Sequence, residues 1–122
     1  MRKIAENTIS MALEVTEEHN KQTAEYNLSK GRAADHMFYD AEDLFAMYKT
    51  PTPKRDALRF YLDSLGDEIL RDLVALMYSG RGDDDYAVMR DHVKEWDHNG
   101  CVMKLVEKAP LATYLQKGLE RI

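Results

Sequence analysis

The sequence predicts an all-α fold, a compact bundle of about five to six short helices around a central apolar helix at about residues 68–79. Apolar residues recur at the helical period between glycine and proline breakers, while strand signals are scarce. Hydrophobic residues make up 44% of the 122 residues, and a chain of this size can bury most of its apolar surface without disulfides or metals. Residues 1–122 are therefore expected to form a single helical domain.

The first helix is expected from residue 2 to about residue 20. Its apolar and polar residues separate onto opposite sides at 100° per residue. The apolar side consists of Ile4, Ala5, Thr8, Ile9, Ala12, Val15, Thr16 and His19. Residues 21–36 are polar and poorly patterned. They are expected either to extend this helix or to form a mobile connection that ends near Gly31.

A short helix is expected over residues 40–49. Asp40 is a suitable N-cap, and Asp43 places an acid in the first turn, where the helix dipole favours negative charge. The sequence TPTP at residues 50–53 ends this helix, because the residue before a proline is disfavoured in the helical conformation.

The next helix is expected over residues 53–65. Thr52 can cap it, and Pro53 suits its first position, since proline lacks the N–H that a helix start leaves unpaired. Its apolar face consists of Ala57, Leu58, Tyr61, Leu62 and Leu65. Gly66 ends the helix and separates it from the central one.

The central helix is expected over residues 68–79. Its apolar residues cover about 200° of the helical surface, so neighbouring elements must cover most of it. These residues are Ile69, Leu70, Leu73, Val74, Leu76, Met77 and Tyr78. Gly80 is expected to end the helix by adopting the left-handed conformation. The need for cover on several sides also suggests self-association.

Three shorter helical segments follow the central helix. The first, capped by Asp83 or Asp84, is expected to end at residues 99–100. Its apolar stripe consists of Tyr86, Met89, Val93 and Trp96. The second carries the apolar residues of 102–106. The third spans residues 110–118, begins after an Ala-Pro breaker and is expected to end at its final glycine.

The charge and composition argue against several classes of function. The formal net charge is −5 and no basic stripe is visible, so direct nucleic-acid binding is not expected. There is no run of about eighteen apolar residues to predict a membrane span, and polar residues interrupt the N-terminal segment, which does not resemble a signal peptide. The single cysteine, Cys101, excludes an internal disulfide. A cytoplasmic location is expected.

The sequence contains no catalytic or metal-binding constellation. Asp91, Glu95 and His98 have the spacing of a helical metal site, but they are expected on the solvent side, opposite the apolar stripe. Residues 83–85 begin like a calcium loop, yet the later ligand positions are wrong. Cys101 lacks an oriented base and is expected to be structural. We therefore expect a non-enzymatic protein without cofactor or metal.

The turn after the central helix is the one candidate binding site. Its residues are Tyr78, Gly80, Arg81, Gly82 and Asp83, together with the later Tyr114. The simpler interpretation is a hinge of the fold, in which the glycines take unusual dihedral angles and Asp83 caps the next helix. The alternative is an exposed Arg81 beside a helix N-terminus, where it can bind an anion or a partner's carboxylate.

Two segments, LRDLVALMYSGRGDDDY and APLATYLQKGLE, resemble a known family. The matching residues are Leu73, Ala75, Leu76, Tyr78, Gly80, Arg81, Gly82, Asp83, Pro110, Leu111, Tyr114, Leu115, Gly118 and Leu119. Together they are similar to the domain-of-unknown-function 3775 family. The resemblance implies an all-helical domain of bacteria or their mobile elements. It supplies no established activity and no catalytic residue.

Three functions remain open from the sequence. The leading hypothesis is a non-enzymatic protein-interaction or regulatory module, because seven tyrosines and seven methionines suit contact surfaces. The second is a protein that binds a small anionic ligand through Arg81. The third is an acidic inhibitor of a nucleic-acid-binding partner, which predicts a contiguous acidic face.

Overall fold

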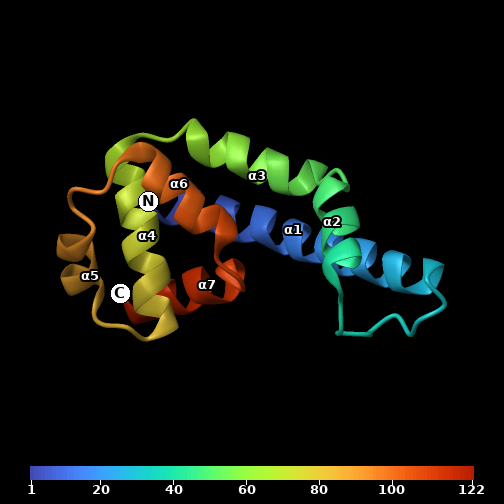
Figure 1. The fold of residues 1–122 in the computed structure, drawn as a ribbon. Helices are drawn as coiled ribbons and strands as arrows, with labels where there is room; N and C mark the ends of the chain where they lie inside the picture. The colour runs from blue at the N-terminus through green and yellow to red at the C-terminus, as the bar shows by residue number, and fades with distance from the viewer.

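The computed structural model describes residues 1–122 and contains seven helices and no strand. They are α1 (Arg2–Ser29), α2 (Ala41–Lys49), α3 (Pro53–Asp63), α4 (Asp67–Arg81), α5 (Tyr86–His92), α6 (His98–Glu107) and α7 (Leu111–Arg121). The all-α prediction is confirmed. Figure 1 shows α5, α6 and α7 gathered around α4, while the long helix α1 extends to one side, where α2 crosses it.

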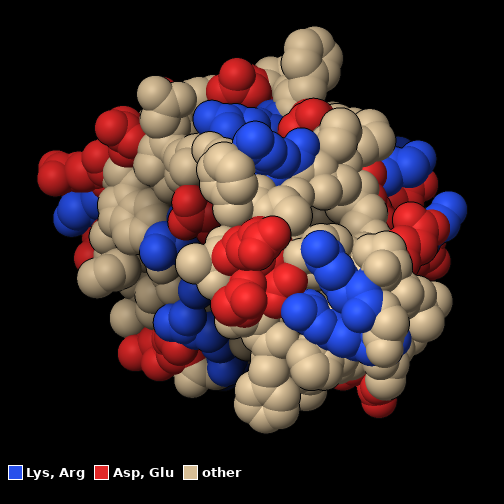
Figure 2. Space-filling view, turned by 45° about the vertical axis from the view of Figure 1, so that its right-hand side comes forward, with Lys and Arg blue, Asp and Glu red and all other residues tan.

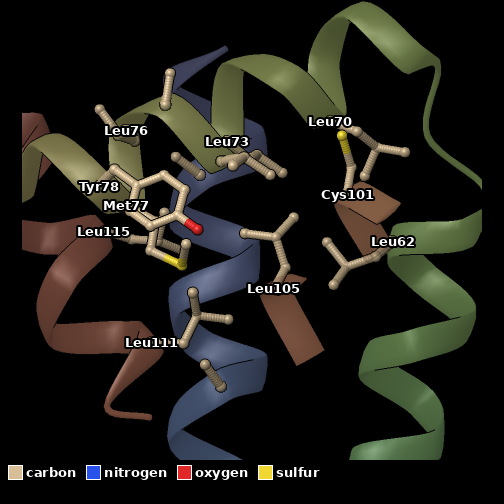
Figure 3. Close-up of a cluster of buried hydrophobic side chains, with 14 of the residues drawn as sticks. Leu62, Leu70, Leu73, Leu76, Met77, Tyr78, Cys101, Leu105, Leu111 and Leu115 are labelled. Carbon is tan, nitrogen blue, oxygen red and sulfur yellow. The ribbon is translucent and has the colours of Figure 1, made fainter. Parts of the chain in front are cut away.

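Helix α4 is the centre of the core, as its apolar composition predicts. Every residue from Leu73 to Gly80 is buried, and α4 packs on α5, α6 and α7. Side chains from α3, α4, α6 and α7 point toward one another in this core (Figure 3). Because these helices cover α4 within one chain, the need for cover gives no reason for self-association.

Two glycines that were expected to end helices lie inside them instead. Gly80 belongs to α4 and Gly118 to α7. A Cβ atom on Gly80 would lie 1.7 Å from the carbonyl oxygen of Tyr114, and one on Gly118 would lie 2.3 Å from that of Leu76. The prediction of two helix stops was therefore wrong, because each glycine lets the backbones of α4 and α7 come into contact.

The left-handed residue that ends α4 is Gly82, with φ 100°. Its N–H donates to the Ser79 carbonyl at 3.0 Å, and the Asp83 N–H donates to the Tyr78 carbonyl at 3.1 Å. This pair of bonds is a Schellman motif, which satisfies carbonyls that a helix end leaves free. A left-handed glycine does end the central helix, as predicted, but it is Gly82 and not Gly80.

The boundary between the first two helices after α4 lies earlier in the chain than expected. Helix α5 begins at Tyr86 and ends at His92, and the predicted stop at residues 99–100 lies in the first turn of α6. Arg71 of α4 donates from Nε to the Trp96 carbonyl at 2.9 Å and holds the intervening turn. The Asp97 side chain then accepts the Gly100 N–H at 2.6 Å and caps α6.

The end of α5 at His92 also separates residues that were expected to lie on one helix. Asp91, Glu95 and His98 no longer share a helix, so the common face that was expected for them does not exist. The predicted caps Asp83 and Asp84 precede the cap position, which Asp85 occupies without a side-chain hydrogen bond.

Helix α1 continues to Ser29, so residues 21–29 extend it, which was one of the two expected alternatives. Helix α3 begins at Pro53 as predicted, but the Thr52 side chain does not cap it. The Glu18 carboxylate of α1 takes that role, because it accepts the N–H groups of Lys54 at 2.8 Å and Arg55 at 3.3 Å. A helix start favours an anion, and α1 supplies one from a distant part of the chain.

Candidate functional site

The Arg81 side chain is bound by a carboxylate of its own turn. Its Nε donates to Asp83 Oδ1 at 3.1 Å and its Nη2 to Asp83 Oδ2 at 2.6 Å. The guanidinium also lies over the Tyr78 ring, 4.9 Å from the ring centroid. This ion pair holds the pKa of Asp83 below its usual value. The two-pronged contact leaves the guanidinium plane already matched to a carboxylate.

The other candidate residues of the turn lie in the packing between helices. Tyr78 is buried and meets Trp96 edge to face, with the ring centroids 6.2 Å apart. Tyr114 contributes its backbone carbonyl to the close contact with Gly80. The structure thus brings the six predicted residues together at the end of α4, and every one of these contacts is within the chain.

His98, at the start of α6, has two carboxylate partners. Its Nδ1 lies 2.9 Å from Asp67 Oδ1, and its Nε2 lies 2.9 Å from Asp63 Oδ1. Hydrogen bonds to these two acids raise the pKa of His98 above its usual value. The contact ties α6 to the corner between α3 and α4. Cys101, one turn later, is buried, and burial raises the pKa of its thiol, which makes it a poor nucleophile.

A cleft of about 420 Å³ lies between α1, the start of α3 and the connection from α6 to α7. Its floor is apolar, and its rim carries charges of both signs, including Glu18, Arg55 and Lys108. The Glu18 carboxylate already accepts hydrogen bonds from the backbone at the start of α3, and neither Arg55 nor Lys108 forms an ion pair. Sequence reasoning missed this cleft because its walls come from three distant segments.

A second feature that the sequence did not reveal is an arm formed by residues 21–49. It comprises the end of α1, the connecting loop and α2, and it lies at one end of the molecule, away from α4–α7 (Figure 1). Asp43 is the only buried residue of α2. It accepts a hydrogen bond from the Tyr26 hydroxyl at 2.5 Å and pairs with Arg32 at 3.1 Å.

Asp43 also holds the start of its own helix. Its carboxylate accepts the Asp40 N–H at 3.1 Å, and the Asp40 carboxylate accepts the Asp43 N–H at 2.9 Å, which is a complete capping box. The bond from Tyr26 lowers the pKa of Asp43, and in turn raises the pKa of Tyr26 to about 12. The predicted cap is confirmed, and its second acid proves to be the anchor of the arm.

The loop of the arm is held by Asn27, a buried residue in the last turns of α1. Its side-chain amide donates to the carbonyls of Ala34 at 3.0 Å and His36 at 3.1 Å. The Tyr39 hydroxyl donates to the same His36 carbonyl at 2.6 Å. Polar contacts with α1 therefore fix the path of the chain from one helix to the next.

The arm exposes several large apolar side chains. We call this the arm surface and define it by five side chains whose exposed fractions are large. They are Met37 (81%), Phe38 (83%), Leu44 (56%), Phe45 (59%) and Tyr48 (87%). A helix over residues 40–49 was predicted from the sequence, but no exposed apolar side on it. Only the structure shows that no neighbouring helix covers it.

The face of the molecule in Figure 2 carries charges of both signs. On the face in Figure 2, acidic and basic side chains gather in small neighbouring groups, and neither sign covers the face. None of the seven helices combines the length and the apolar composition that a membrane span requires.

The fold and the contacts at its turns define a small helical domain built on a glycine-mediated crossing of α4 and α7. The model of a family described as "Protein of unknown function (DUF3775)" matches residues 55–122, more than half of the chain. The protein belongs to this family, which confirms the resemblance found in the sequence. The match begins at residue 55, after α1 and α2, so the arm lies outside it. Neither the curated proteins nor the solved structures gave a match.

Proposed function

We propose that this protein is a non-enzymatic protein-interaction module, of an adaptor or regulatory kind, and that the arm surface is where it binds. The observation that carries the proposal is the exposure of five large apolar side chains on a single small arm. Monomeric proteins rarely expose apolar patches much larger than about 300–600 Å², and larger ones mark interaction sites.

The way α2 is anchored supports this proposal. An ordinary surface helix turns its apolar side inward and its charges outward. Helix α2 departs from this pattern, since it buries the carboxylate of Asp43 and exposes Leu44, Phe45 and Tyr48. Polar contacts hold the helix to α1, and its apolar side is left for contact with another surface.

The two alternatives have weaker support. A small anion at Arg81 would have to displace the two-pronged contact with Asp83. An acidic inhibitor needs a contiguous acidic face, and the face in Figure 2 does not present one, because its charges are mixed. The arm surface involves neither of these features, so variants can separate it from the turn.

The test is affinity capture from cell lysate with the wild type and three variants. The double variant Phe45→Ala/Tyr48→Ala removes the centre of the arm surface. Phe60→Ala is the matched control, because Phe60 is 80% exposed on α3, outside the arm. Arg81→Ala probes the turn. Exposed side chains contribute little to stability, so all variants are expected to fold.

We expect partners to be retained by the wild type, Phe60→Ala and Arg81→Ala, and lost by the double variant. A partner lost only with Arg81→Ala would move the binding site to the turn. Retention of every partner by the double variant would contradict the proposal.

A further inference from the structure

We propose that the arm surface binds a second copy of this chain, with the two α2 helices packed antiparallel about a two-fold axis. This inference rests on the proposed function and names the partner of the same surface. Three properties of α2 carry it: the area that it leaves exposed, the spacing of its apolar residues and the placement of its charges.

The exposed area matches what a dimer needs. A fully exposed aromatic side chain presents about 150–250 Å². At the observed exposed fractions, the three aromatic side chains of the arm surface present roughly 350–570 Å², and the exposed parts of Met37 and Leu44 add to this area. A stable interface of standard size takes about 800 Å² from each partner. One copy of the arm surface is therefore sufficient to form one half of such an interface.

The apolar residues of α2 follow the spacing of a helix-packing seam. Ala41, Leu44, Phe45 and Tyr48 stand at i, i+3, i+4 and i+7, and all four are exposed. These positions share one side of a helix. An antiparallel pair brings Leu44 and Phe45 of one copy against Tyr48 of the other, and the small Ala41 leaves room for the larger rings.

The charges of α2 are complementary to themselves under the same symmetry. Glu42 lies in the first turn and Lys49 in the last. The two residues are seven positions apart, so they lie on the same flank of the apolar seam. A two-fold axis across an antiparallel pair places each Glu42 beside Lys49 of the second copy, twice in the interface. In a parallel pair the same flank of the two copies would lie on opposite sides of the seam, so neither Glu42 would meet a Lys49.

The first measurement is the mass of the purified protein in solution over a range of micromolar concentrations, by sedimentation or light scattering. We expect a dimer that dissociates on dilution. Phe45→Glu is expected to be monomeric throughout, because it buries a charge in the seam. Phe60→Glu adds the same charge on α3 and is expected to dimerise like the wild type. A monomeric wild type, or a dimer that Phe45→Glu leaves intact, overturns the inference.

The second measurement tests the antiparallel register. Glu42→Lys and Lys49→Glu each replace two attractions by two repulsions, so each is expected to weaken the dimer about tenfold or more. The double variant Glu42→Lys/Lys49→Glu restores both pairs and is expected to regain most of the lost affinity. Its α2 carries charges that oppose the helix dipole, so the recovery cannot come from a more stable helix. A double variant weaker than both single variants overturns the register.

The two proposals fail in different ways. A purified protein that is monomeric, combined with a lysate partner that depends on Phe45 and Tyr48, refutes the dimer and leaves the interaction module standing. A dimer that depends on Phe45 supports both. A monomer without any arm-dependent partner refutes both.

Discussion

Replacing Gly80 with alanine tests the closest contact in the core. A Cβ on Gly80 would lie 1.7 Å from the Tyr114 carbonyl oxygen, half of the 3.4 Å at which ordinary contact begins. The obstructing atom belongs to the backbone of α7 and cannot rotate away. Helices α4 and α7 must therefore move apart or rotate, and this pair has the most extensive contact between helices in the chain.

Two effects of opposite sign set the magnitude. Alanine is about 1 kcal/mol more favourable than glycine inside a helix. Forcing extra atoms into a packed core costs about 1–3 kcal/mol, and more when the neighbours cannot yield. For a backbone obstacle we take about 3–5 kcal/mol from the upper end of that scale. The net expectation for Gly80→Ala is a loss of about 2–4 kcal/mol in the free energy of unfolding.

Urea denaturation followed by circular dichroism measures this loss. Gly66→Ala is the control, because a Cβ there meets nothing within 4 Å and the φ angle is −70°. Its cost is expected to stay below about 1 kcal/mol, the scale of a changed N-cap. If Gly80→Ala proves as stable as the wild type or more so, the close crossing of α4 and α7 does not exist as described.

Three further predictions concern the core, the arm and the corner at α6. Leu73→Ala removes a fully buried side chain and is expected to cost on the order of 2–5 kcal/mol; an unchanged denaturation midpoint would contradict its central position. Tyr26→Phe removes the hydroxyl that anchors Asp43, so amide hydrogen exchange in α2 is expected to rise about tenfold or more while α4 stays protected; uniform exchange would argue against a separate anchor. His98 has a pKa raised above 6.5 in the folded state, so its stabilisation is present below about pH 6.5 and is lost as the pH rises through the raised value. The stability advantage of the wild type over His98→Gln is therefore expected to shrink as the pH rises above about 6.5, and an advantage that grows with pH would refute this role.

Local signals were sufficient to predict several elements. Asp40 and Asp43 form the expected capping box, and Pro53 opens α3 at the expected residue. The dense apolar run predicted that α4 would be central, and it is. These features depend on a few neighbouring residues, so the sequence contains all the information that they need.

Tertiary contacts account for the errors. A glycine after an apolar run favours a helix stop. Gly80 instead lies inside α4, in backbone contact with α7, which is more than thirty residues away in the chain. The turn between α5 and α6 contains a bond from Arg71 of α4 to the Trp96 carbonyl. Helical periodicity carries no information about either contact.

The candidate site was predictable only in part. The residues around Arg81 were identified as a group, and the structure brings them together. The choice of Asp83 as the partner of Arg81 depends on the side-chain directions at the turn. The arm surface was hidden for a different reason. An apolar stripe on a helix predicts a side that packs against another element. Whether the same chain supplies that element depends on the arrangement of all its helices.

Helix α1 connects the core to the arm without a break. One unbroken helix of 28 residues, about 40 Å long, reaches from the core into the arm. Its first half packs on α3 and α7, and Gln22 fixes its second half to the Pro51 carbonyl at 2.7 Å. The arm therefore cannot swing freely on a hinge. A partner bound at the proposed arm surface would be held at a set distance and angle from the core.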